Sequence, residues 1–92
     1  MIQSFHCADT QALFMTGKNR RFSAIGNVAT RKLQQLDSAA TLEFLRSPPG
    51  NRLEALKGDR SGQHSIRIND QWRVCFVWTD AGPAHVEIVD YH

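Results

Sequence analysis

The sequence has few cysteines and no long apolar run. Cys7 and Cys75 are its two cysteines, so at most one disulfide can form, and we expect a reduced, cytoplasmic setting. The longest unbroken apolar stretch is VCFVW at 74–78, which is too short to span a bilayer. The N-terminus has no early Lys or Arg before an apolar segment, so we predict neither a signal peptide nor a membrane partner.

Familiar metal and cofactor motifs are also missing. The histidines and cysteines lack the C-x-x-C or H-x-x-x-H spacing that gathers metal ligands, apart from the adjacent His6 and Cys7. There is no P-loop, no G-x-G-x-x-G and no G-x-S-x-G motif. We therefore predict no bound metal and no phosphate or dinucleotide cofactor.

Acidic residues are absent from one long stretch. All eleven Lys and Arg lie between Lys18 and Arg73, and five of them fall within residues 10–36, where no Asp or Glu occurs. The net charge is only +2, so the distribution is the feature that needs a reason. The stretch is either an ordinary solvated surface or a contact for a polyanion.

The length of 92 residues suits a single domain with one core, which we predict over residues 1–92. Residues 1–7 are typical of a short strand. Residues 17–27 combine two glycines and three positive charges with little apolar content, which predicts a loosely held loop. Apolar spacing predicts three helical segments, at 8–16, 28–36 and 41–45.

From residue 52 onward the apolar period changes from helical to two. Four strand candidates follow, separated by the turn-forming stretches GDRSG, NDQ and DAGP. With the helices gathered before them, they predict an α+β fold in which helices pack on one face of a small antiparallel sheet. The predicted strands are 52–57, 63–68, 72–79 and 84–91.

The register of the central hairpin leads to a sharper prediction. Its inward-facing candidates are Ile66, Ile68, Trp72 and Val74. They share a face only if paired residue numbers sum to an even value, which a turn at 69–71 satisfies. Arg67 then lies opposite Arg73, an arrangement of like charges that is unfavourable. Either an anion lies between them or each pairs with a carboxylate, for which the candidates are Glu54, Asp59 and Glu87.

The last strand ends in side chains that can exchange or orient protons: Asp90, Tyr91 and His92. The register rule sends Asp90 to one face with Val86 and Ile88, and Tyr91 to the other. Beside Arg and Lys, such a set fits metal-free RNA cleavage. There the 2′-hydroxyl attacks the adjacent phosphate, a base accepts its proton, cations stabilise the dianionic transition state and an acid protonates the leaving oxygen. The alternative is a solvated histidine and a core tyrosine.

Two stretches, LEALKGDRSGQHSIRINDQWRVCF at 53–76 and VDYH at 89–92, resemble the HigB toxins of bacterial toxin–antitoxin modules, in the RelE/ParE superfamily. The similarity extends over the whole chain. It implies a compact RelE/ParE-like fold and a metal-independent endoribonuclease that cleaves mRNA on the translating ribosome. It also implies a HigA-type helix-turn-helix antitoxin, through which alone operator DNA would be contacted. The alternatives are a ParE-like toxin that inhibits DNA gyrase without cutting RNA, and a plain interaction module.

The resemblance also assigns the catalytic residues. His92 would be the main proton-transfer group, Asp90 would orient it or share its work, and Tyr91 would position or stack the RNA. The chain departs from some relatives, which carry a histidine where it has Glu54. Glu54 would act as a base if its pKa is raised, or it would tether an arginine, and a weaker toxin would follow.

Basic residues are assigned to RNA binding. The resemblance places residues matching Lys57, Arg60 and Arg73 in or beside the RNA cleft, and the register argument adds Arg67. The basic stretch at 18–32 would contact ribosomal RNA or the antitoxin, and we expect it to be mobile in the free protein.

Overall fold

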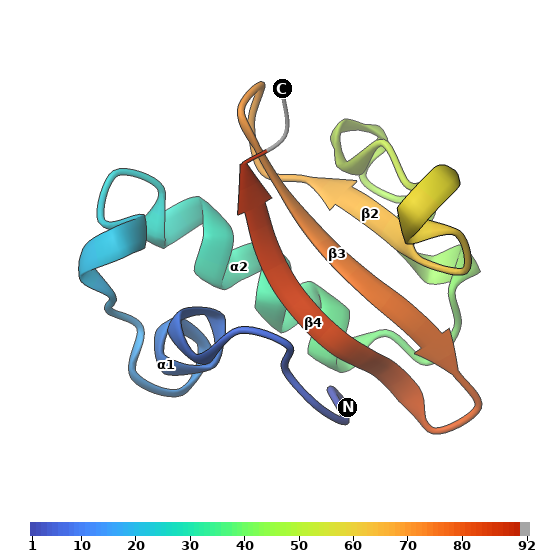
Figure 1. Ribbon diagram of the computed structural model, residues 1–92, viewed down its shortest axis with the longest axis horizontal. Coiled ribbons are helices and arrows are strands. Elements are labelled where there is room, and N and C mark those ends of the chain that lie inside the picture. The colour runs from blue at the N-terminus through green and yellow to red at the C-terminus, as the bar shows by residue number, and fades with distance from the viewer. Residues whose placement is uncertain (91–92) are drawn as a thin grey trace.

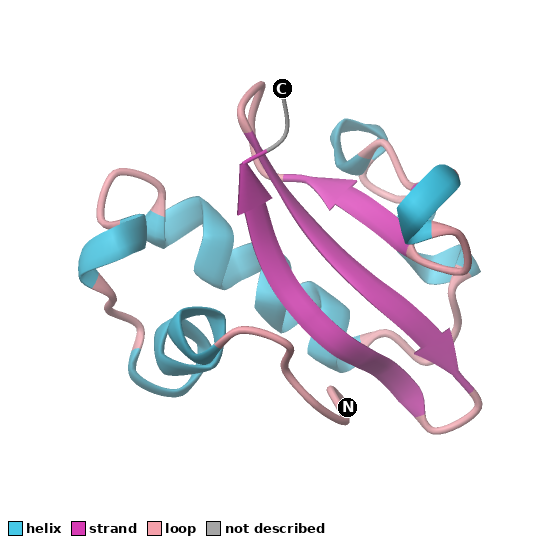
Figure 2. Cartoon of the chain, viewed as in Figure 1, coloured by secondary structure: helices cyan, strands magenta, loops and turns pink. Residues whose placement is uncertain are grey.

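The computed structural model describes residues 1–90, which form two layers (Figure 1). One layer is an antiparallel sheet of four strands in the order β1-β2-β3-β4. The other holds two α-helices, and short 3₁₀ turns fill much of the chain between the second helix and the sheet (Figure 2). The elements are α1 (Ala8–Thr16), η1 (Arg20–Phe22), α2 (Gly26–Ser38), η2 (Glu43–Arg46), η3 (Pro49–Asn51), β1 (Glu54–Ala55), η4 (Gly58–Arg60), β2 (His64–Arg67), β3 (Trp72–Thr79) and β4 (Gly82–Asp90). The predicted α+β fold is confirmed.

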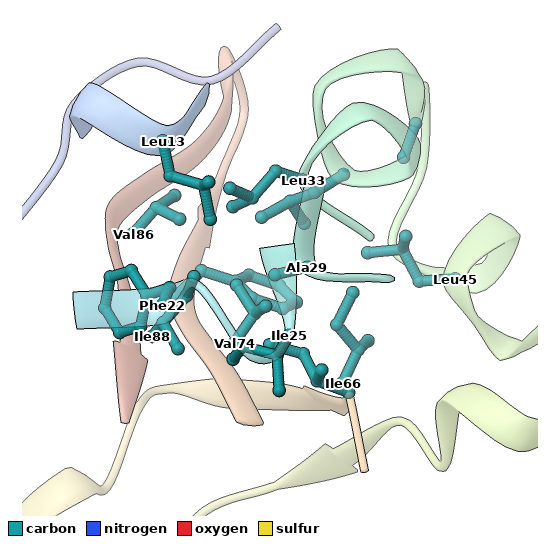
Figure 3. Close-up of a cluster of buried hydrophobic side chains, with 14 residues drawn as sticks. Leu13, Phe22, Ile25, Ala29, Leu33, Leu45, Ile66, Val74, Val86 and Ile88 are labelled. Carbon is teal, nitrogen blue, oxygen red and sulfur yellow. The ribbon is translucent and has the colours of Figure 1, made fainter. Parts of the chain in front are cut away.

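Helix α2 packs directly against the sheet. It buries Ala29, Leu33 and Leu36, which are spaced by four and three residues and so share one helix face. These side chains meet Ile66 and Val74 from the sheet in the main core (Figure 3). The helix therefore covers one face of the sheet, and its basic residues lie on the helix faces that are left.

Helix α1 is joined to the last strand by a buried hydrogen bond. Thr10 is fully buried, and its Oγ1 accepts a hydrogen bond of 3.0 Å from the backbone N–H of Ile88. The helix ends at Gly17, whose φ of 78° is left-handed and whose N–H donates to the carbonyl of Leu13. The predicted helix boundaries at 8–16 are confirmed.

The predicted strand at 1–7 is wrong in extent. One parallel bridge joins Phe5 to Val86, with hydrogen bonds of 3.0 and 3.1 Å on either side of it. A bulge in the β3–β4 ladder, where His85 has a φ of 52°, lies beside this bridge. Within the described residues, the pairing of this segment with β4 is limited to that isolated bridge.

The expectation of a loosely held loop at 17–27 is also wrong in one respect, because the segment supplies two core residues. Phe22 is 1% exposed and Ile25 is 8% exposed, and the Phe22 ring packs edge-on against Trp72 with 5.6 Å between ring centroids. Burying an aromatic ring of this size stabilises a fold by roughly 1.5–3 kcal/mol. Phe22 therefore anchors this segment in the core, although its neighbours in the sequence are positively charged.

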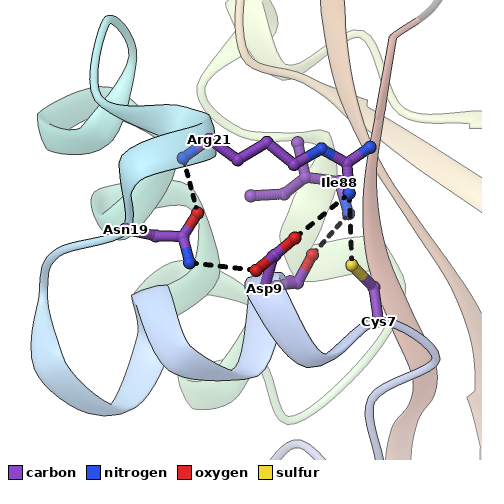
Figure 4. A network of polar contacts seen from close by, with 6 residues as sticks. Cys7, Asp9, Asn19, Arg21 and Ile88 are labelled. Atoms are coloured by element: carbon purple, nitrogen blue, oxygen red, sulfur yellow. Dashed lines mark hydrogen bonds and ion pairs between the residues drawn. The ribbon is translucent and has the colours of Figure 1, made fainter.

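A polar network also ties this loop to α1 (Figure 4). The guanidinium of Arg21 lies 3.5 Å from the carboxylate of Asp9 and donates to Cys7 Sγ at 3.7 Å. Asn19 donates to the same carboxylate at 3.2 Å and accepts from the N–H of Arg21 at 3.0 Å. Burial raises the pKa of Cys7, but hydrogen bonds from Thr10 and the backbone of Asp9, together with Arg21, outweigh it and lower the pKa below the usual value.

Within residues 1–90, every helix is too short or too polar to cross a membrane.

Candidate active site

The central hairpin has the predicted register. Arg67 pairs with Arg73 across β2 and β3, and Ile66 pairs with Val74. The turn is held by Asn69, whose Oδ1 accepts from the N–H groups of Gln71 and Trp72, both at 2.8 Å. Two arginines therefore lie directly opposite each other in the sheet.

Side chains of the sheet that alternate with the core residues point away from α2. We call the surface they form the site face. Two rows cross it. The first row is Glu54, Ser65, Cys75 and Glu87; the second is Arg67, Arg73 and Val89.

Arg60 reaches the site face from the segment between β1 and β2. Its turn is closed by a hydrogen bond of 2.9 Å from the N–H of Leu56 to the carbonyl of Gln63. Arg60 Nη1 lies 2.9 Å from Glu87 Oε1 and 3.2 Å from the side-chain oxygen of Gln63. The Glu87 side chain is only 18% exposed, so this ion pair is partly shielded from water.

Cys75 lies in the middle of the first row and is fully buried. Burial raises the pKa of its thiol to about 11, which Glu87 and Glu54 reinforce and the nearby arginines oppose. The sulfur is therefore a neutral thiol at physiological pH and is a poor nucleophile.

The carboxylate that pairs with Arg67 is not one of the three candidates named from the sequence. Arg67 forms an ion pair with Asp70, which lies in the turn three residues further on and is fully exposed. Hydrogen bonding to Arg67 lowers the pKa of Asp70, and the charges of Arg52 and Arg73 add to this effect. Glu87, named as a partner for Arg67 or Arg73, pairs with Arg60. From the sequence, Asp70 is interpreted only as a turn residue, so its second role as a charge partner is missed.

Glu54 and Lys57 are both exposed and belong to the segment around the two-residue strand β1. Glu54 pairs with Ser65 and so lies at the opposite end of its row from Glu87. Three strand spacings separate these two backbones, a distance of about 14 Å. Glu54 is therefore on the site face but at the far edge from the end of β4.

Asp90 ends the described chain, opposite Trp72 and next to the arginine row. It is exposed, and its Oδ2 accepts a hydrogen bond of 3.1 Å from the side chain of Gln71. As predicted, it follows Val86 and Ile88 onto the other side of the sheet from Glu87. Tyr91 and His92, the remaining predicted catalytic residues, lie outside the described residues.

The structure thus brings three of the predicted RNA-binding residues, Arg60, Arg67 and Arg73, onto one sheet face. It does not bring Glu54 together with Asp90. The sequence interpretation missed the contribution of Asp70, although its spacing of three residues from Arg67 across a tight turn was a usable signal. Among residues 1–90, no three His, Cys, Asp or Glu side chains are grouped closely enough to hold a metal ion.

The two-layer fold, with two helices on a four-stranded antiparallel sheet, fits a small RelE-like toxin domain. Residues 4–92 match the model of a family described as the RelE-like toxin of the type II toxin–antitoxin system HigB. The chain therefore belongs to the HigB-like toxin family.

Curated relatives agree with this assignment. The chain is 50% identical over 58 residues to Toxin HigB-1 of Vibrio cholerae serotype O1. This match covers 63% of this chain and 61% of that protein. It is 31% identical over 94 residues to the Endoribonuclease HigB of Proteus vulgaris, with all of both chains covered. An uncharacterized protein of Haemophilus influenzae is 37% identical over 54 residues, covering 59% of this chain and 54% of that protein. The chain thus spans less than two thirds of the length of the Vibrio and Haemophilus relatives.

Proposed function

We propose that this protein is an endoribonuclease toxin that cleaves mRNA on the translating ribosome in the cytoplasm. A cognate HigA-type antitoxin with a helix-turn-helix domain would neutralise it. The observation that carries the proposal is the cross-strand pair of Arg67 and Arg73 on the same sheet face as Arg60. Membership of the HigB-like family and the name of the Proteus vulgaris relative support it.

The arginines supply the electrostatic part of the proposed chemistry. Side chains directly opposite each other on adjacent strands start about 5 Å apart, so both guanidinium groups can reach one phosphate. An RNA phosphate between Arg67 and Arg73 turns their repulsion into a shared attraction. As the 2′-hydroxyl attacks, negative charge grows on this phosphate, and fixed cations stabilise it more than they stabilise the ground state.

The end of β4 supplies the proton transfers in this proposal. His92 protonates the leaving 5′-oxygen, Asp90 orients it or shares the transfer, and Tyr91 stacks on a base or positions the RNA. The backbone of Asp90 pairs with Trp72, the neighbour of Arg73, so Asp90 lies one residue beyond the cationic row along the sheet, with its side chain on the opposite face. This chemistry requires a ribose 2′-hydroxyl and no metal ion.

Glu54 has a narrower role than the sequence suggested. The partner of Arg67 is Asp70, so a tethering role of Glu54 toward Arg67 loses its support. An exposed carboxylate at the edge of the site face can accept a proton from a ribose hydroxyl or hydrogen-bond to it. Lys57, exposed on the same segment, would hold a phosphate further along the RNA.

Primer extension on cellular mRNA after induction of the toxin tests the function. The proposal predicts cuts at codon spacing. These cuts should disappear when translation is blocked before ribosomes reach the site. Intact message together with an SOS response would instead identify a gyrase inhibitor of the ParE type. Growth after induction without the antitoxin separates both from a plain interaction module, because only a toxin inhibits growth when the antitoxin is absent.

A further inference from the structure

A second cationic site lies at the edge of β2, beside the site face. It is a pocket of about 380 Å³ between α2, the turn η3 and the end of β2. Helix α2 contributes four lining residues spaced three and four apart, which places them on one helix face. The lining residues are Val28, Arg31, Lys32, Gln35, Pro48, Gly50, Arg67 and Ile68.

Lys32 is held in place by a buried amide. Its Nζ donates a hydrogen bond of 2.5 Å to Oδ1 of Asn51, which is fully buried. The amide nitrogen of Asn51 is held in turn by the side chain of Gln35 and the carbonyl of Leu45, both at 3.1 Å. The ammonium group is therefore fixed before any ligand arrives, which lowers the entropy cost of binding one.

Three cations converge on this pocket. Burial lowers the pKa of Lys32, and the nearby charges of Arg31 and Arg67 lower it further. Among residues 1–90, no Asp or Glu lines the pocket. The carboxylate paired with one of its residues is Asp70, whose side chain is fully exposed. Like charges gathered in a concave site without a lining acid are characteristic of a site for an anion.

We propose that this pocket binds a backbone phosphate of the RNA, at a position beside the scissile phosphate. Arg67 belongs both to the pocket and to the pair with Arg73, so an RNA strand leaving the site face meets the pocket next. A phosphate fits three converging donors in a hollow, whereas an acidic peptide segment needs a longer open surface. The inference rests on the proposed function, because it takes RNA as the ligand.

The test measures RNA binding without cleavage. The probe is a short fluorescein-labelled RNA with 2′-O-methyl groups, which lacks the attacking hydroxyl, and anisotropy is followed between 50 and 200 mM salt. Arg31→Gln removes one cation from an exposed helix position and leaves the Lys32–Asn51 bond in place. The matched control is Arg46→Gln, an exposed arginine that lies outside this pocket and outside the basic stretch at 18–32.

Losing one phosphate contact to a single strand should reduce the slope of log affinity against log salt by about 0.7. The same factor makes binding about fivefold weaker at 0.1 M salt, counting ion release alone. Arg46→Gln should keep the slope of the unmodified protein. Equal slopes for Arg31→Gln and Arg46→Gln, or RNA binding by the unmodified protein that does not depend on salt, would overturn the proposal.

A second substitution is expected to act in the opposite direction. Asp70→Asn removes the carboxylate that competes with RNA for Arg67, and should tighten binding by about 1.4- to 5-fold, the range for an exposed ion pair. Asp80→Asn, which removes a charge from the exposed turn between β3 and β4, is the control and should have no such effect. Equal affinities for the two variants count against the pocket.

Two further arms separate this inference from the proposed function and from a protein ligand. If mRNA is cleaved on ribosomes but the slope of Arg31→Gln is unchanged, the pocket proposal fails and the function stands. If mRNA stays intact but the slope falls by about 0.7, the function fails and the phosphate site stands. If Arg31→Gln loses binding to a poly-glutamate peptide but keeps its binding to RNA, the pocket belongs to an acidic protein partner, contrary to the proposal.

Discussion

Replacing Arg67 with Gln separates the structural cost of the arginine pair from its function. Arg67 lies directly opposite Arg73, and cross-strand pairs of charges change stability by roughly 0.2–1 kcal/mol, unfavourably for like charges. The substitution also breaks the ion pair with Asp70, whose carboxylate is fully exposed. Loss of this ion pair offsets part of the stability gained by removing the repulsion. Relief of the repulsion therefore sets the upper limit, a rise in Tm of at most roughly 8 °C. We expect Arg67→Gln to be as stable as the unmodified protein or slightly more stable.

Cleavage should respond very differently to the same substitution. Removing one fixed donor from a site that stabilises developing negative charge typically lowers the rate by about 10²–10³. The assay is cleavage of ribosome-bound mRNA with purified components, and thermal unfolding is measured on the same preparation. Arg46→Gln is the matched control, because Arg46 also pairs with a carboxylate three residues away, Glu43, but lies in the exposed turn η2.

The reasoning would be refuted in either of two ways. Arg67→Gln that cleaves as fast as Arg46→Gln would show that the arginine pair does not act on the scissile phosphate. Arg67→Gln that unfolds many degrees below the control would show that the pair supports the fold, in which case a loss of cleavage would carry no information on catalysis.

Three further outcomes follow from the same structure. Glu87→Gln should lower kcat/KM about tenfold, because the arginine it holds at 2.9 Å loses its charged partner; an unchanged value in the cleavage assay would remove its positioning role. Phe22→Ala should lower the free energy of unfolding by about 3–5 kcal/mol in urea titration, and Phe44→Ala, at a site that is 55% exposed, should change it far less. Between pH 7 and 9 a thiol reagent should modify Cys7 before Cys75, because the pKa of Cys7 is lowered and that of Cys75 is raised to about 11; the reverse order in mass spectrometry would contradict this.

The sheet was largely predictable from the sequence because its signals are local. Alternating apolar residues and a three-residue turn predict the pairing of Arg67 with Arg73, and the structure confirms it. The strand at 52–57 shrank to Glu54–Ala55, since propensity alone does not state how far a neighbouring strand extends at an edge. Two of the three predicted helical segments are α-helices, and α2 extends two residues further at each end than the pattern indicated. The third, predicted at 41–45, is the 3₁₀ turn η2 (Glu43–Arg46).

The parts that could not be predicted depend on contacts between distant segments. Phe22 stands among positive charges and has no periodic partner, so its place beside Trp72 in the core follows only from the folded arrangement. The partner of Arg60 is 27 residues away, and several carboxylates were equally plausible from sequence. The pocket at the edge of β2 is lined by residues from α2, the η3 region and β2, so no single stretch of the sequence indicates it.

The most direct test of the central claim is cleavage of a defined mRNA in a purified translation system, mapped by primer extension. Our account predicts cuts at codon spacing that require ribosomes, and their loss in His92→Ala and Asp90→Asn variants that keep the Tm and the antitoxin binding of the unmodified protein. An intact message at toxin concentrations that stop growth, or full cleavage by His92→Ala, would contradict it.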